Sequence, residues 1–274
     1  MYYVYGDESH DEGSRRVFAV AGLLGRQEDW ASLETAWLDR MGGRTFHASD
    51  CETDHGEFAG TSHSENLDLY ADLVKLLAHS SLYGFGSAID LAGHDEFFPG
   101  VPEDIPYYRC FRDVLVFFGE HAARMKIQEK IHFVFDGRQE SNYNTSVLYS
   151  YMARLPEWKS SPLLKEEISF STRSTVGIQA ADLWARETMK HLDNMIGPVK
   201  RPMRRSMELL ASTNRFGGDY FMKEFFSDFR RQFEEVSRTV GVSEQAYANW
   251  LKENRAADSI SSRHRYLIDL DKQP

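Results

Sequence analysis

The sequence predicts an α/β domain built on a mixed sheet with helices on both faces. Short aromatic and β-branched segments are typical of strands, longer segments carry apolar residues at helical spacing, and along the chain two strands come before alternating helices and strands. With 274 residues, of which 42% are hydrophobic and 27% charged, the chain can bury a full core. We expect one domain over residues 1–195, with an insertion at about 26–80, and a helical C-terminal extension over 196–274.

The first elements follow from side-chain periodicity. Residues 2–7 alternate and carry aromatic and β-branched side chains, which predicts a strand, and the continuous apolar run at 17–24 suits a buried second strand. Trp30, Leu33 and Trp37 are spaced as on one face of a helix. The stretch from 46 to 60 is polar and rich in His and Asp, and we expect it to be irregular.

The later elements alternate between the two periodicities. Apolar residues at helical spacing predict helices at 67–77, 105–122, 144–155 and 178–192, the third of which ends before Pro156. Short apolar runs predict strands at 82–89, 131–136 and 168–172. A Gly-Pro boundary at 197–202 then precedes two further expected helices, at 221–236 and 244–254.

Composition excludes several classes of protein. A formal net charge of −10 argues against a passive polyanion binder. No apolar run approaches the roughly 18 residues of a membrane helix, and the start of the chain is too short and too acidic for a signal peptide. Two cysteines, Cys51 and Cys110, cannot form a disulfide framework, which favours a cytoplasmic location.

Three acidic residues occupy positions where side chains of different elements can meet. Asp7 and Asp136 each end a predicted strand, and Asp182 lies early in the last predicted helix of the domain, at the border of its apolar stripe. Open α/β sheets place their sites at the C-terminal ends of strands. An Asp at any one of these positions, taken alone, is more often a turn or helix-cap residue. Glu8 joins the group only if the turn after the first strand begins early.

Four short motifs in order resemble a known family, the one called domain of unknown function 3800. They are Tyr5-x-Asp7-Glu8-Ser9, Phe46-His47-Ala48 followed by Asp50, Asp136 at the end of an apolar strand, and Gln179-Ala180-Ala181-Asp182-Leu183. That family is similar to the RNase H-like superfamily. The resemblance implies a mixed five-stranded sheet flanked by helices over roughly the first 195 residues.

The resemblance also implies a function. It assigns catalysis and metal ligation to Asp7, Asp136 and Asp182, with Glu8 as a fourth ligand, and a substrate contact to His47. Ser9 and Gln179 are candidates either for substrate contacts or for contacts that position the metal ligands. Carboxylates are the ligands that Mg²⁺ and Mn²⁺ take, and two such ions can clamp the attacking water and the leaving oxygen of a phosphodiester. We therefore expect a nuclease with two bound Mg²⁺ or Mn²⁺ ions. At the level of the family, the resemblance implies a prokaryotic accessory or mobile-element protein, with phage defence as one role.

Basic residues gather later in the chain. Residues 1–60 hold five Arg and no Lys against twelve Asp or Glu, whereas residues 165–238 hold thirteen basic and eleven acidic residues. The cluster at 200–205 is consistent with a solvated face. It is also consistent with a basic rim that contacts the nucleic-acid backbone, to which Arg204 and Arg205 would contribute.

Other sites and functions were weighed against this hypothesis. The His and Asp residues of 47–63 lack the regular spacing of a zinc site, Ser9-His10 lacks a nucleophile elbow, and no P-loop is present. The main rival is a catalytically silent RNase H-like module that binds nucleic acid or a protein partner. A hydrolase of small nucleotides is a third alternative, and the sequence leaves a homodimer open.

Overall fold

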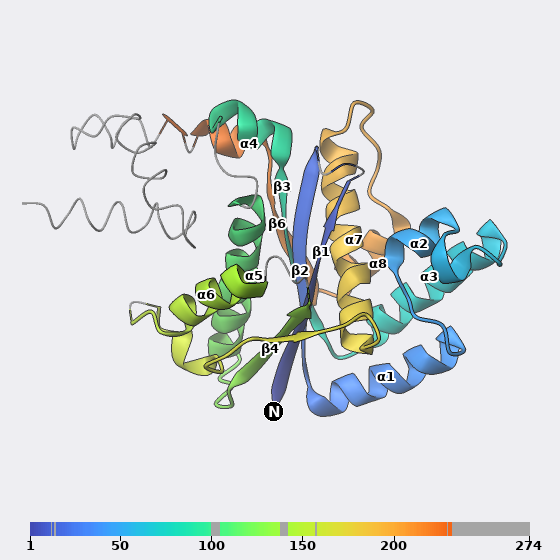
Figure 1. Cartoon of the computed structure of the whole chain (residues 1–274), viewed down its shortest axis with the longest axis horizontal. Coiled ribbons are helices and arrows are strands. Elements are labelled where there is room, and N and C mark those ends of the chain that lie inside the picture. Colours follow the sequence, from blue (N-terminus) through green and yellow to red (C-terminus); the bar gives the residue numbers. More distant parts are fainter. Residues whose placement is uncertain are drawn as a thin grey trace, which may run out of the picture.

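A single mixed sheet organises the molecule. The computed structural model describes residues 1–231 except 12, 14, 100–104, 138–141, 157 and 229. Within this part, six strands form one sheet in the order β5-β4-β1-β2-β3-β6 (Figure 1). The strands are β1 (Tyr2–His10), β2 (Val17–Arg26), β3 (Tyr83–Asp90), β4 (Ile131–Asp136), β5 (Ser169–Ser171) and β6 (Phe216–Phe221). The predicted mixed α/β sheet flanked by helices is confirmed, with six strands in place of five.

The sheet contains both antiparallel and parallel neighbours. β1 and β2 pair antiparallel, as do β2 and β3, whereas β4 is parallel to β1, β5 to β4 and β6 to β3. A short turn joins β1 to β2, and parallel neighbours need a longer crossover, which helices supply. The carboxyl ends of β1 and β4 therefore point to the same edge of the sheet.

The turn between β1 and β2 is closed by one buried carboxylate. Asp11 Oδ1 accepts hydrogen bonds from the backbone N–H groups of Arg15, Arg16 and Val17 at 2.9–3.1 Å. Gly13 lies in this turn with φ +79°, a conformation that favours glycine. The turn thus begins only after His10, and β1 stays regular through the acidic residues near its end.

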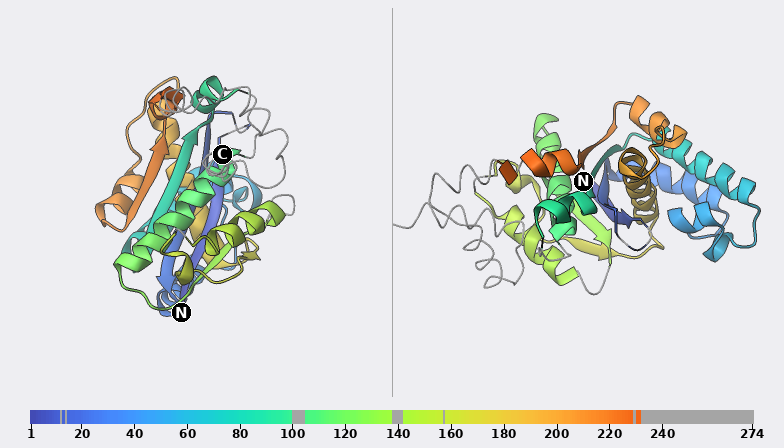
Figure 2. Two further views of the ribbon diagram at one scale, coloured as in Figure 1. Left: turned by 90° about the vertical axis from the view of Figure 1, so that its left-hand side faces the viewer. Right: turned by 90° about the horizontal axis from the view of Figure 1, so that it is seen from above.

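One face of the sheet is covered by α7 (Val176–Ile196), behind which further helices pack (Figure 2). Trp37, Phe46 and Trp184 are fully buried in the core on this side. The outer helices on this side are α1 (Gln27–Met41), α2 (Ala48–Thr53), α3 (His63–His79) and α8 (Arg205–Ser212).

Helix α7 lies unusually close to the sheet at two points. A methyl group on Gly177 would lie 2.4 Å from the Tyr5 ring, and one on Gly86 would lie 2.3 Å from Thr188 Oγ1. Because glycine is needed on one side of each contact, the helix is held tightly near its start and again about three turns later. Asp182 lies on the stretch of α7 between these two contacts.

The opposite face is covered by α5 (Ile105–Arg124) and α6 (Asn142–Ala153), with α4 (Leu91–Phe97) following β3 at the end of the sheet (Figure 1). Phe111 and Phe118 of α5 pack with Phe133 and Phe135 of β4 in a second core. Cys51 and Cys110 are both buried free thiols. No helix in the described ranges is long and apolar enough to span a membrane.

Three segments differ from the sequence prediction. Part of the stretch expected to be irregular forms α2 and a 3₁₀ turn (Gly56–Phe58), and α4 was not predicted. Residues 216–221, placed in the helical extension, form β6 and pair with β3. Glycines at 217 and 218 weaken the strand signal, so the pairing edge of β3 decides the structure there. The helix expected at 244–254 lies outside the described residues. The part of the helix expected at 221–236 that follows residue 231 lies outside them as well.

Candidate active site

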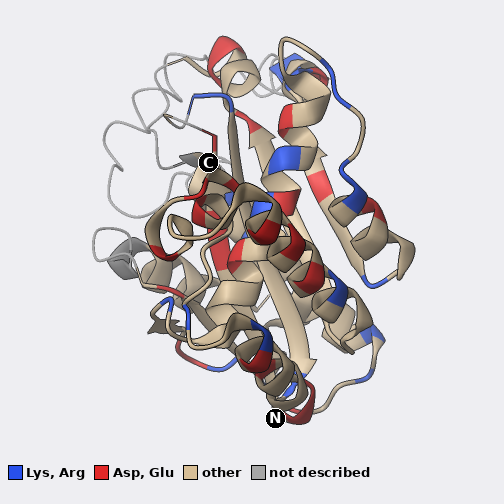
Figure 3. Ribbon diagram, turned by 90° about the vertical axis from the view of Figure 1, so that its right-hand side faces the viewer, with Lys and Arg blue, Asp and Glu red and all other residues tan. Residues whose placement is uncertain are grey.

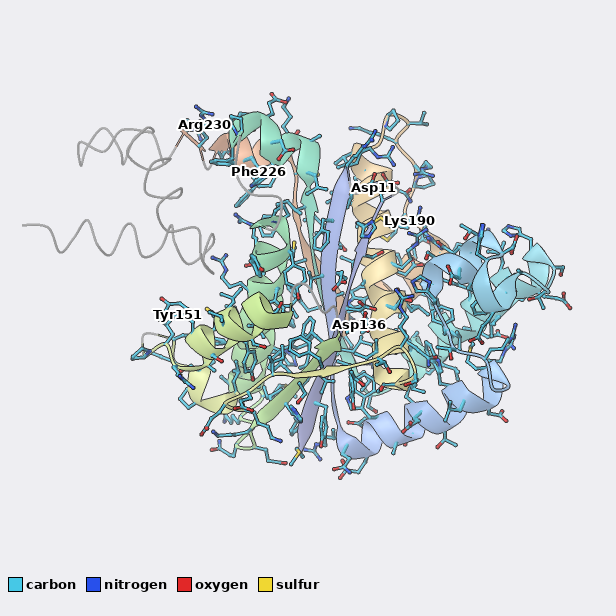
Figure 4. All side chains as sticks on the ribbon, viewed as in Figure 1. Asp11, Asp136, Tyr151, Lys190, Phe226 and Arg230 are labelled. Carbon is cyan, nitrogen blue, oxygen red and sulfur yellow. The ribbon has the colours of Figure 1, made fainter. Side chains whose placement is uncertain are left out.

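Two acidic residues from neighbouring strands lie on the same face of the sheet. Tyr3 packs against the core under α7, and Asp7 lies four residues further along β1 on that side. His132 of β4 contacts Tyr3 with ring centroids 5.4 Å apart, and Asp136 lies four residues further along β4. The strands are parallel and in register up to the residues just before these acids. Asp136 is the last residue of β4 (Figure 4). Asp7 lies beside it on β1, which continues to His10, so the prediction that Asp7 ends its strand is wrong.

Helix α7 supplies the third acid from above this face. Asp182 is 8% exposed and Asp7 is 5% exposed, so both carboxylates are largely removed from water. Asp182 Oδ2 accepts a hydrogen bond from the backbone N–H of Ala48 at 2.7 Å. Asp7 Oδ1 accepts one from the backbone N–H of Glu8 at 2.8 Å. Each buried acid is thus held through one of its two oxygens.

The electrostatics show that the acids form one group. The carboxylate of Asp7 lies close enough to three other carboxylates for their charges to shift its pKa. Burial, the largest cause, and the neighbouring charges of Asp182, Glu8 and Asp136 raise its pKa well above the ordinary value. The site therefore contains like charges that repel one another. This repulsion is what we expect if Asp7, Asp136 and Asp182 converge.

Nearby cations relieve this repulsion only in part. Burial raises the pKa of Asp182, although Arg173, Arg186 and, when protonated, His47 act in the opposite direction. The hydrogen bond from Ala48 also favours the ionised form. Since the net direction is upward, burial outweighs these partners.

Glu8 lies across the sheet from the other acids. β1 continues as a regular strand to His10, so alternation directs Glu8 to the face covered by α5. Glu8 is buried, at 7% exposure, and its charge still acts on Asp7. The early turn that would bring Glu8 into the acidic group is absent from this part of the chain, and its role as a fourth ligand stays a prediction.

Two of the sequence motifs are docked against each other. Gln179 Oε1 accepts hydrogen bonds from the Phe46 backbone N–H at 3.1 Å and from Trp37 Nε1 at 2.9 Å. Asp182, three residues on, receives the N–H of Ala48. Two side chains on one stripe of α7 thus bind alternate backbone N–H groups, one just before α2 and one at its first residue. The amide of Gln179 acts here as a structural clamp, and its predicted contact with substrate stays a prediction.

His47 and Ser9 both border the acidic group. His47 precedes α2, pairs through Nδ1 with Asp50 Oδ2 at 2.9 Å, and is near enough to favour ionisation of Asp182. Ser9 lies two residues beyond Asp7 on the same face of β1 and is buried. The fold therefore places both residues where their predicted substrate contacts could be made.

The environment of Arg204 differs from that expected of a residue on a solvated face or at a rim that contacts nucleic acid. Its guanidinium pairs with Glu52 of α2 and, at 3.3 Å, with Glu187 of α7, and it lies over the Tyr70 ring at 5.5 Å. Arg186 also pairs with Glu52, at 2.8 Å. Arg204 therefore links α2 and α7 to the segment before α8, and this structural role was not predicted.

Arg205 is exposed at the first position of α8. Figure 3 shows basic segments along the loop that leads to α8 and acidic segments on the neighbouring helices. Arg205 is thus the more exposed member of the predicted basic pair.

Sequence reasoning missed three features of the site: Arg173, Arg186 and the Ala48 N–H. Arg186 follows Asp182 by four residues, a helical spacing that could have pointed to it. The Ala48 N–H gives no side-chain signal. Within the described ranges, no group of three or more His, Cys, Asp or Glu is arranged to hold a metal ion.

The raised pKa of Asp7 predicts a pH dependence of stability. A group whose pKa is higher in the folded than in the unfolded state stabilises the fold at low pH. That stabilisation is lost as pH rises from about 4, the unfolded value, through the raised folded value. Asp7→Asn keeps an acceptor for the Glu8 N–H and removes the charge. We expect metal-free Asp7→Asn to gain stability over wild type progressively as pH rises, as measured by urea unfolding in EDTA. A difference independent of pH would contradict the coupling.

Comparisons with known proteins give matches among solved structures alone. No protein-family model matches the sequence, and no curated protein matches it. The chain is similar to Bst-RNase HIII in complex with Mn²⁺, with a TM-score of 0.42 and 13% identity, over 77% of this chain and 64% of that one. It is similar to a Gln-to-Ala variant of Bst-RNase HIII with the same TM-score and identity, over 76% of this chain and 64% of that one. The chain thus spans less than two thirds of the length of the proteins it matches.

Proposed function

We propose that the chain is a metal-dependent phosphodiesterase that hydrolyses nucleic acid. The observation that supports the proposal is that the buried carboxylate of Asp7 on β1 lies within electrostatic reach of Asp136 on β4 and Asp182 on α7. Buried carboxylates that repel one another destabilise a protein unless a cation or a proton offsets their charge. Such a cluster is therefore best explained by a cation that acts in function.

The donor set fits Mg²⁺ or Mn²⁺ in its chemistry. Both ions take oxygen ligands, and the three side chains offer carboxylate oxygens alone. In the described residues, Asp7 Oδ2 and Asp182 Oδ1 have no hydrogen-bond partner, whereas the second oxygen of each is held by a backbone N–H. Because no ligand set is preformed there, the proposal requires these acids to turn toward a common point when a cation binds.

The roles of the chain's own groups follow from this arrangement. Asp7, Asp136 and Asp182 would hold two ions, which supply an activated water and stabilise the leaving oxygen. The N–H groups of Glu8 and Ala48 orient the two buried carboxylates. Burial excludes bulk water from the acids and strengthens their attraction for a cation.

Activity is tested directly with a panel of single- and double-stranded DNA and RNA. We expect Mg²⁺- or Mn²⁺-dependent cleavage of at least one substrate, lost in EDTA. The rival is a silent binding module, favoured by the lack of a preformed ligand set, and it predicts binding without cleavage. The resemblance to domain of unknown function 3800, a cytoplasmic location and a part in phage defence stay predictions.

Metal binding gives a test that needs no substrate. A ligand that binds only the folded state stabilises it by about 2.7 kcal/mol at about a hundredfold excess over Kd. For a protein of this size we expect wild type to gain about 5–11 °C in Tm with Mn²⁺, and Asp136→Asn to gain much less. Asp95→Asn, an exposed acid on α4, serves as the control and should respond as wild type does. Equal gains in wild type and Asp136→Asn would remove Asp136 from the metal site.

A further inference from the structure

Arg173 lies on a rigid turn between β5 and α7. The backbone N–H of Thr175 donates to the carbonyl of Thr172 at 2.9 Å. The carbonyl of Arg173 accepts a hydrogen bond from Gln179 Nε2, also at 2.9 Å. Ser171 Oγ and Thr175 Oγ1 lie 2.6 Å apart across the same turn. The main chain at Arg173 is thus fixed from both sides.

This turn joins the elements that carry two of the acids. Ser171, two residues before Arg173, is the strand partner of Asp136. Gln179, which holds the Arg173 carbonyl, lies three residues before Asp182 on α7. Arg173 therefore stands at the rim of the acidic group, on the short connection between its β4 side and its α7 side.

The side chain of Arg173 is exposed to solvent. Among the described residues, no hydrogen bond or ion pair involves its guanidinium, whereas Arg186 and Arg204 are occupied by Glu52. Its charge nevertheless reaches Asp182 and lowers the pKa of that carboxyl, against the larger effect of burial. Arg173 is thus a cation within electrostatic reach of Asp182 whose guanidinium has no partner among the described residues.

We propose that Arg173 contacts the substrate and binds a phosphate oxygen of the diester that lies at Asp136 and Asp182. This inference rests on the proposed function. Carboxylates repel a phosphate, and a fixed arginine at their rim offsets that repulsion and can bind phosphate oxygens in bidentate fashion. A rigid main chain lowers the entropy lost when the side chain becomes ordered on the substrate.

The test measures binding separately from turnover. Labelled single- and double-stranded DNA and RNA oligonucleotides are titrated in Ca²⁺ by fluorescence anisotropy at several salt concentrations. We expect Arg173→Gln to bind several-fold more weakly and to lower the slope of log affinity against log salt by about one unit. Arg173→Lys should keep the slope and recover part of the affinity, because it keeps the charge and loses the planar fork.

A matched control separates a local contact from general attraction. Arg154 is also exposed, and it follows α6 on the opposite face of the sheet. Arg154→Gln should leave affinity and slope unchanged. If wild type binds an oligonucleotide and Arg173→Gln binds it with the same affinity and slope, the Arg173 contact is overturned and the proposed function stands. If wild type binds no member of the panel, both are overturned.

Discussion

Asp182→Asn is expected to cut metal-dependent cleavage by at least about a hundredfold, since even residues that only support metal ligands cost about 10–100-fold when changed. Asparagine keeps an oxygen that can accept the Ala48 N–H, so the segment before α2 should stay docked. It lacks the negative charge that holds a cation. The loss of rate should therefore appear in a protein whose metal-free Tm is no lower than that of wild type, when initial rates in Mn²⁺ and thermal unfolding in EDTA are measured on the same preparation.

Asp193→Asn is the matched control for this result. Asp193 is another buried acid of α7, but it pairs with Arg16 and Arg201 near the end of the helix. We expect this variant to lose stability and to cleave at close to the wild-type rate per folded molecule. If Asp182→Asn keeps more than about a tenth of the wild-type rate, a loss of under 1.4 kcal/mol, Asp182 has no place in the mechanism.

Arg204→Ala is expected to lower the free energy of unfolding by about 3–5 kcal/mol, because removal of one partner leaves buried charges uncompensated. Glu187 is fully buried and accepts hydrogen bonds from Tyr70 and Ser206. Burial raises the pKa of Glu187, and Arg204 acts against that rise. Glu52 loses one of its two arginine partners in the same variant. For a protein of this size, the change corresponds to about 6–20 °C in Tm.

Arg205→Ala is the control for Arg204→Ala. Its side chain is exposed one residue further along, and surface changes of this kind usually stay within about 0.5 kcal/mol. Urea unfolding of the two variants beside wild type compares them directly. Equal stabilities for Arg204→Ala and wild type would mean that the ion pairs around Glu52 and Glu187 contribute nothing to the fold.

Much of the fold could be predicted because local patterns agree with tertiary packing. The alternation in β1, the apolar run of β4 and the stripe of α7 each match the face that the element buries. β6 could not be predicted in this way. Its Phe-Gly-Gly-Asp-Tyr-Phe sequence has weak strand propensity, and it becomes a strand because the edge of β3 offers hydrogen-bonding partners. At β6, pairing with the edge of β3 therefore outweighs the low strand propensity of the sequence.

The acids of the candidate site were accessible to sequence reasoning for a geometric reason. A two-residue period fixes the face of Asp7 and of Asp136, and a helical period fixes the border position of Asp182. The environment of Arg204 was not accessible, because it depends on how α2 and α3 pack against α7. Its partners Glu52 and Tyr70 lie more than 130 residues earlier in the chain. Charge counts along the chain carry no information about such pairings.

The distribution of the acids along the chain has a consequence for synthesis on the ribosome. Asp7 is made before Asp182, which lies 175 positions later in the chain. At about 5–20 residues per second, this interval lasts about 9–35 s. Until α7 has emerged and settled between its two glycine contacts, the nascent chain carries β1 and β4 without the third acid. A growing chain beside messenger RNA would therefore lack the assembled site until most of the sheet has been translated.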